Sequence, residues 1–177
     1  MAINLSFKGL ENALRLMVPV IFLAFLFMLS VVALPIPQIG HIKPAYILMT
    51  IYYWSIFRPT LVPPWICFFV GLLLDLLSNL TPGVNAVIFT LVQWVVRDQR
   101  QFLMGQPYIV LWFVFAFVTA CAHMMQWGMY GLAAGLQWAP LLPVGISMAA
   151  TFLLFPVISL VLILIHRVLP ETQRAYS

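Results

Sequence analysis

The hydrophobic positions of this chain form six runs, which are separated by short segments that contain proline, glycine or charged residues. Four of the runs approach the roughly 20 apolar residues that a membrane-spanning helix needs, and the other two are shorter. In chain order the runs cover residues 16–34, 44–57, 63–80, 82–96, 107–127 and 140–166. The pattern predicts an all-α, polytopic membrane protein with six transmembrane helices in a single domain, residues 1–177.

Proline supports the predicted start of five of these helices, at Pro44, Pro63, Pro82, Pro107 and Pro140. The first turn of a helix tolerates proline, because its missing N–H would have no partner there and its fixed φ suits the helix. Thr81, directly before Pro82, is expected to cap the fourth helix.

The first fifteen residues show apolar positions at helical spacing opposite polar ones, which predicts a short amphipathic helix on the cytoplasmic face of the membrane; the alternative is a frayed terminus. The following run, 16–34, is longer than the roughly 7–15 apolar residues of a signal peptide. We therefore expect an uncleaved first transmembrane helix.

Composition excludes a water-soluble fold. Hydrophobic residues make up 64% of the chain, charged residues only 7%, and the mean hydropathy is +1.09. An ordinary soluble domain carries about 25% charged residues. The net charge of +4 does not indicate nucleic acid, since the basic residues stand at helix ends rather than in one dense cluster.

The basic residues also predict the orientation. With six crossings and a cytoplasmic N-terminus, seven of the eight Lys and Arg residues lie inside and only Lys43 lies outside, as the positive-inside rule expects. If the run 44–57 did not cross, every later arginine would move outside. We therefore expect both termini in the cytoplasm.

Asp75 is the single acidic residue within a predicted span, and charge at such depth is costly. Asn85, His123 and Gln126 are expected at a similar level, under the outer loops. One interpretation is that the four residues hydrogen-bond to one another and hold helices together, which such clusters commonly do. The other is a ligand or proton site, and the first interpretation is favoured.

Three further features have two interpretations each. The Arg58-Pro59 corner follows Tyr52-Tyr53-Trp54, and is either an interfacial anchor, which we favour, or a docking surface. Gly71 lies one turn before Asp75 and allows another backbone to approach closely, from this chain or from a partner helix. The cysteines, Cys67 and Cys121, are expected to be packing residues rather than a disulfide or a metal pair.

Catalysis is not expected. The chain carries no His-Glu-x-x-His, Gly-x-Ser-x-Gly or glycine-rich phosphate motif. His41, His123 and His166 stand at separate places, so neither a metal site nor a cofactor is predicted.

Two segments resemble a known family. The first is Tyr52-Tyr53-Trp54-Ser55-Ile56-Phe57-Arg58-Pro59, followed by Pro63-Pro64-Trp65. The second is Gly71-Leu-Leu-Leu-Asp75-Leu-Leu-Ser78-Asn79, followed by Pro82-Gly83-Val84-Asn85-Ala86. In this order they resemble the rod shape-determining protein MreD family, which the chain's length, six apolar runs and basic turn after the fourth helix also match. The positions matching the family pattern are Arg58, Pro59, Gly71, Asp75, Pro82, Gly83 and Asn85.

The resemblance implies a non-enzymatic scaffold of the cell-elongation complex, which directs lateral-wall peptidoglycan synthesis in rod-shaped bacteria. It implies a place in the bacterial cytoplasmic (inner) membrane, with MreC as the direct partner. RodA, a class B penicillin-binding transpeptidase and MreB would be indirect partners. It also implies a fold similar to the substrate-binding subunits of energy-coupling-factor transporters. The alternative is a small-molecule-binding or transporter subunit, with a pocket near Asp75 and His123.

Overall fold

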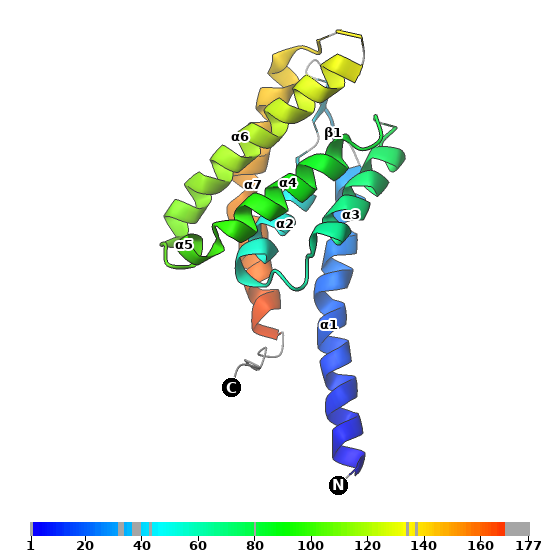
Figure 1. Ribbon diagram of the computed structural model, residues 1–177, viewed down its shortest axis with the longest axis vertical. Coiled ribbons are helices and arrows are strands. Elements are labelled where there is room, and N and C mark those ends of the chain that lie inside the picture. The colour runs from blue at the N-terminus through cyan, green and yellow to red at the C-terminus, as the bar shows by residue number, and fades with distance from the viewer. Residues whose placement is uncertain are drawn as a thin grey trace.

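The computed structural model describes residues 2–31, 34–36, 40–42, 44–79, 81–133, 135–136 and 138–168. The described residues form seven helices and one short antiparallel hairpin (Figure 1). The helices are α1 (Ala2–Val31), α2 (Tyr46–Phe57), α3 (Pro64–Leu77), α4 (Val84–Asp98), α5 (Arg100–Met104), α6 (Tyr108–Ala133) and α7 (Leu141–Val168). The strands are β1 (Leu34–Ile36) and β2 (Gly40–Ile42). The predicted helical architecture is confirmed.

The five predicted prolines do mark helix starts, although each lies just before the first turn rather than in it. Pro63 is the N-cap of α3, and α6 and α7 begin directly after Pro107 and Pro140. The helices α2 and α4 begin two residues after Pro44 and Pro82.

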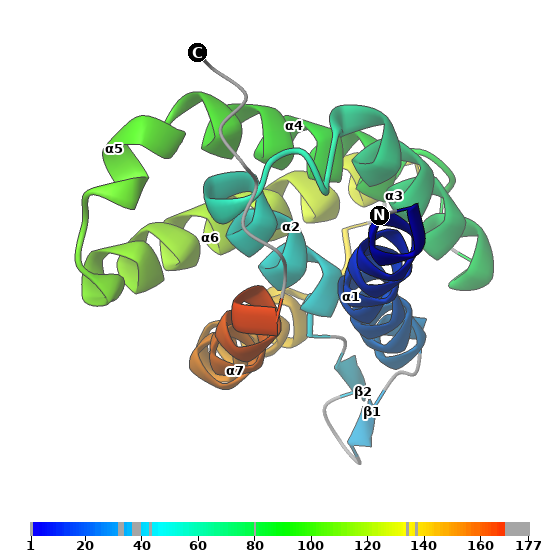
Figure 2. The same cartoon turned by 90° about the horizontal axis from the view of Figure 1, so that it is seen from below.

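Helix α2 lies in the middle of the molecule, between α1, α4, α6 and α7 (Figure 2). All its residues from Tyr46 to Ile56 are buried, as expected for a helix that is apolar on every side. The ring of Tyr52 packs against Phe115 and Phe155, and its hydroxyl donates to the Leu111 carbonyl at 2.9 Å. Helix α2 is therefore the core around which the others pack.

The burial of α2 corrects the favoured interpretation of its aromatic residues. Tyr52, Tyr53 and Trp54 pack inside the chain and are not available as anchors among lipid headgroups. Trp65, at the start of α3, is 63% exposed and is the aromatic residue near this corner that fits the anchor role.

The outward faces of the helices are largely apolar, and several polar side chains are buried between the helices. Large hydrophobic side chains are exposed on several helices, among them Phe25 on α1, Phe69 on α3, Phe117 on α6 and Leu160 on α7. Soluble monomers rarely expose continuous apolar surface on this scale. Lipid is the medium that such a surface fits.

Among the residues that the structure describes, two helices, α6 and α7, are by themselves long and apolar enough to cross a membrane. The apolar helices α2 and α3 have 12 and 14 residues and rise about 18 and 21 Å, less than the roughly 30 Å hydrocarbon core. The six-crossing arrangement therefore stays a prediction.

Several expected boundaries are wrong. The amphipathic segment and the first span form one continuous helix, α1, rather than a surface helix and a separate span. The outer loop expected at 35–43 contains the β1–β2 hairpin, in which Leu34 pairs with Ile42. The loop expected from 128 onward begins later, because α6 continues to Ala133. The short helix α5 was not expected at all.

The two cysteines differ. Cys67 is fully buried in the core, which confirms its expected packing role. Cys121 on α6 is exposed, so a packing role for it within this chain is not supported.

Gln93 on α4 provides a test of the core. It is fully buried, and neither Nε2 nor Oε1 has a hydrogen-bond partner among the described residues. A buried polar group without a partner costs about 1–3 kcal/mol. We expect Gln93→Met to raise the thermal unfolding midpoint of the purified protein in detergent, while Gln101→Met, at an exposed position, leaves it unchanged. A lowered midpoint for Gln93→Met would contradict this account of the core.

Candidate functional site

Asp75 caps the first turn of α4 from the neighbouring helix α3. It is fully buried, and its Oδ2 accepts hydrogen bonds from the backbone N–H groups of Gly83 at 2.9 Å and Asn85 at 3.0 Å. The first N–H groups of a helix have no partner within the helix, and its N-terminus favours negative charge. A carboxylate placed here is therefore stabilised without a cation.

The observed cap replaces the one expected from the sequence. Gly83 is the N-cap residue of α4, so the prediction of Thr81 is wrong. Gly83 has a φ of +99°, which glycine adopts without the steric cost that a side chain would add. The preceding Pro82 lies in the same turn between α3 and α4.

Asn85 extends the network from Asp75 to α6. Its Nδ2 donates to Asp75 Oδ1 at 2.5 Å and to the Tyr130 hydroxyl at 3.1 Å, and its Oδ1 accepts from Gln126 Nε2 at 2.5 Å. Both N–H donors of Asn85 are therefore used. The polar network, which we define as Asp75, Asn85, Gln126 and Tyr130, joins α3, α4 and α6 at the end of the molecule that carries the hairpin.

Gly71 allows α3 and α4 to approach closely beside this network. A Cβ built at Gly71 would lie 2.6 Å from both Cα and N of Ala86. Real Cβ atoms do not come this close to a backbone, so a side chain at position 71 would separate the helices. The sequence left open whether the approaching backbone comes from this chain or from a partner helix. In the structure, the backbone next to Gly71 belongs to this chain.

His123 lies near the network but is not part of it. Its Nδ1 is 2.9 Å from the Thr119 carbonyl, one turn earlier on α6. Because a carbonyl only accepts, Nδ1 carries the proton and Nε2 of the neutral ring is an acceptor. The structure thus brings together three of the four residues of the expected cluster, and places the fourth beside them.

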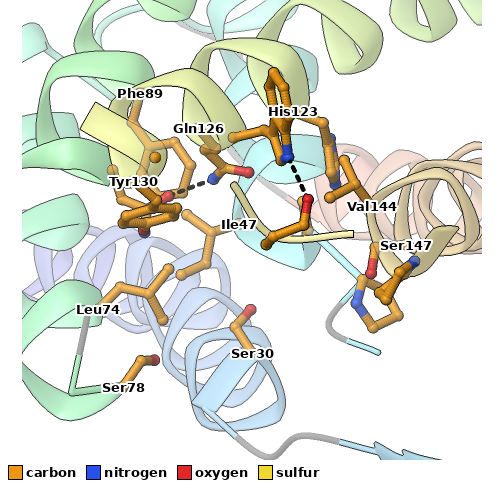
Figure 3. A pocket seen from close by; sticks show the side chains of 17 residues that line it. Ser30, Ile47, Leu74, Ser78, Phe89, His123, Gln126, Tyr130, Val144 and Ser147 are labelled. Carbon is orange, nitrogen blue, oxygen red and sulfur yellow. Dashed lines mark hydrogen bonds between the residues drawn. The ribbon is translucent and has the colours of Figure 1, made fainter. Parts of the chain in front are cut away.

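A cavity of about 410 Å³ lies next to the polar network (Figure 3). The side chains labelled in Figure 3 converge on it from α1, α2, α3, α4, α6 and α7. Its wall is largely apolar, and none of the described residues that line it is Asp, Glu, Lys or Arg. The polar groups come from Ser30, Ser78, Asn85, His123, Gln126, Tyr130 and Ser147.

Two tryptophan side chains pack against each other where α6 connects to α7, beside the cavity. The rings of Trp127 and Trp138 lie 4.6 Å apart, and Trp127 Nε1 donates to the Ala139 carbonyl at 2.9 Å. Trp138 also lies against Gly131. This packing holds the start of α7 against the last turns of α6.

Arg58 and Pro59 lie apart from the polar network, between the end of α2 and the start of α3. Arg58 is the C-cap residue of α2, and its backbone N–H donates to the Trp54 carbonyl at 2.8 Å. Arg100 on α5 reaches the same helix end and donates from Nε to the Ile56 carbonyl at 2.8 Å. Positive side chains at a helix C-terminus are favourable.

Sequence reasoning missed Tyr130, although its position carries a signal. His123, Gln126 and Tyr130 stand at spacings of three and four residues, which places them on one face of a helix. The residue was overlooked because helix α6 was expected to end at residue 127. Within the ranges that the structure describes, no three His, Cys, Asp or Glu side chains gather as a metal site would require.

Comparison with known proteins gives one family. The sequence profile described as rod shape-determining protein MreD matches residues 11–169. No curated protein matches the chain, and no solved structure matches it. The expected likeness to the substrate-binding subunits of energy-coupling-factor transporters therefore stays a prediction.

Proposed function

The chain belongs to the rod shape-determining protein MreD family, and from this we propose that it is a non-enzymatic scaffold subunit of the bacterial cell-elongation complex, binding MreC directly. A role in rod shape determination follows from the family itself. The finer role is to support lateral-wall peptidoglycan synthesis. RodA, a class B penicillin-binding transpeptidase and MreB associate through MreC or the surrounding complex.

The observation that carries this proposal is the family match over residues 11–169. The exposed apolar faces support it, because a membrane helix can pack laterally against them. Phe69, Phe117 and Leu160 are 62%, 70% and 62% exposed and represent three such faces, on α3, α6 and α7. Contacts of this kind need close packing rather than a soluble binding domain.

We further propose that six segments cross the bacterial cytoplasmic (inner) membrane, with both termini inside. The hairpin, the α3–α4 turn and the α6–α7 connection then face outward, toward the periplasmic part of MreC. Arg58, Arg97, Arg100 and Arg167 then face the cytoplasm, which agrees with the positive-inside rule. The charge distribution supports this orientation.

Purification in a mild detergent, followed by mass spectrometry, tests the function. We expect MreC to copurify, and we expect depletion of the chain to turn rod-shaped cells round. An unrelated polytopic protein with the same tag is the control. Copurification of an ATPase module with a bound small solute, in cells that stay rod-shaped after depletion, would favour the transporter alternative instead.

Photocrosslinking tests whether the contact is lateral. A photoreactive amino acid placed in turn at Phe69, Phe117 and Leu160 should trap MreC strongly from one of these faces and weakly from the others. A partner helix covers one side of the bundle, and lipid covers the rest. Failure to trap MreC from all three positions, despite copurification, would contradict lateral packing against these faces.

A further inference from the structure

The cavity beside the polar network has a volume and a lining that are typical of small-molecule sites. Its volume of about 410 Å³ falls within the roughly 300–1,000 Å³ of ligand pockets. Such pockets combine apolar walls with a few convergent polar groups, and this one draws side chains from six helices (Figure 3). The scaffold role proposed above neither requires the cavity nor explains it.

The described part of the wall favours an uncharged ligand. Among the described residues that line the cavity, none carries a permanent charge, so an anion or a cation would lose its hydration there without gaining an ion pair, which is costly. The nearby carboxylate of Asp75 is already engaged by Gly83 and Asn85. An uncharged ligand is the one that fits.

Two acceptors belong to residues of α6 that line the cavity, His123 and Gln126. His123 Nε2 is an acceptor because Nδ1 is committed to the Thr119 carbonyl. Gln126 donates from Nε2 to Asn85, which leaves its Oε1 as an acceptor. Neither acceptor has a hydrogen-bond partner among the described residues, and both residues line the cavity. Each of the two atoms can therefore accept a hydrogen bond from a donor group of a ligand.

The opposite wall is apolar or carries hydroxyl groups. Ile47, Leu74, Phe89 and Val144 offer contact to an apolar body. Ser147 on α7 can donate to the oxygen of a ligand hydroxyl. We propose that the cavity binds an uncharged, largely apolar small molecule through a hydroxyl or N–H group, which donates to His123 and Gln126.

Photolabelling of the full-length protein in detergent tests the proposal. The probe is decanol that carries a photoreactive diazirine at its far end. Two matched probes are its methyl ether, which lacks the O–H donor, and its sulfate ester, which is charged. Peptide mapping then locates the label.

We expect the alcohol to label the cavity-lining parts of α6 and α7, and excess unlabelled decanol to suppress this labelling. The ether and the sulfate should label these segments about tenfold less, because an acceptor left without a partner or a buried charge is unfavourable. Exposed positions such as Phe113 and Phe117 provide an internal standard, since detergent-partitioned probe reaches them without competition.

Variants separate binding from misfolding. His123→Phe removes one acceptor, and Val144→Trp fills the cavity without removing a polar group. Each variant should abolish the labelling by the alcohol probe that excess unlabelled decanol suppresses. Met124→Phe changes an exposed neighbour on α6 and should leave it intact. Equal labelling by all three probes, labelling that excess decanol does not suppress, or undiminished labelling of a folded Val144→Trp protein would overturn the proposal.

Discussion

Replacement of Asp75 by leucine is expected to destabilise the protein strongly, whereas replacement by asparagine is expected to be mild. Leucine leaves the N–H groups of Gly83 and Asn85 and the Asn85 side chain without their acceptor, all in a buried setting. Each such loss costs about 1–3 kcal/mol, and because three groups lose their acceptor we expect a total of at least about 3 kcal/mol.

Asparagine can replace the carboxylate because the network can reorient. The new amide oxygen accepts from the two backbone N–H groups, and its NH₂ group donates to Asn85 if the Asn85 amide flips. Gln126 then flips in turn, and the Tyr130 hydroxyl donates instead of accepting. What is lost is the attraction between a negative charge and the start of α4, about 1 kcal/mol.

Thermal unfolding can be followed with a thiol-reactive dye, since Cys67 is fully buried and becomes reactive when the protein unfolds. Cys121 is exposed and is first replaced by serine. The Asp75→Leu midpoint should fall well below that of Asp75→Asn, which should stay close to the parent. Equal destabilisation by the two substitutions would mean that the negative charge itself is needed.

Gly71→Ala is the second large effect that we expect. The added methyl group would lie 2.6 Å from the backbone of Ala86, which cannot move away as a flexible side chain could. Helices α3 and α4 must separate, which strains the Asp75 cap one turn further along α3. Overpacking of this kind costs about 1–3 kcal/mol, and we expect the upper part of that range or more.

Gly128→Ala is the matched control for this substitution. Gly128 also lies inside a helix, and a Cβ built there meets nothing within 4 Å. Alanine favours helix over glycine by roughly 0.5–1 kcal/mol, so this variant should be unchanged or slightly more stable. If Gly71→Ala unfolds at the same temperature as Gly128→Ala, the close approach of α3 and α4 is not needed for stability.

Helix positions followed from the sequence because hydrophobic runs and prolines mark them directly. The sequence also predicted that Asp75, Asn85 and Gln126 lie close together, because few polar residues lie near the outer end of an otherwise apolar bundle. The role of Asp75 as a cap for α4 could not be predicted from the sequence. Whether the Thr81 hydroxyl or a carboxylate on another helix caps α4 depends on how α3 and α4 pack.

Other features depend on tertiary contacts that a single sequence does not display. The burial of Tyr52–Trp54 follows from the central place of α2, while a pattern of aromatic residues beside an arginine is equally typical of a membrane interface. Helix α6 continues through Gly128 and Gly131, so glycine did not mark the end of this helix. Packing against Trp138 compensates the weak helix propensity of Gly131.

The proposed crossing of the membrane, with the hairpin end outward, is most directly tested by labelling of single cysteines in cells. In a background without Cys67 and Cys121, cysteines are placed at Leu136, in the α6–α7 connection, and at Gln99, after α4; both positions are exposed. A membrane-impermeant maleimide should label Leu136→Cys in intact cells with a permeabilised outer envelope, and Gln99→Cys only after the cytoplasmic membrane is opened. Labelling of Gln99→Cys from outside, with Leu136→Cys protected, would contradict the orientation and the placing of MreC that depends on it.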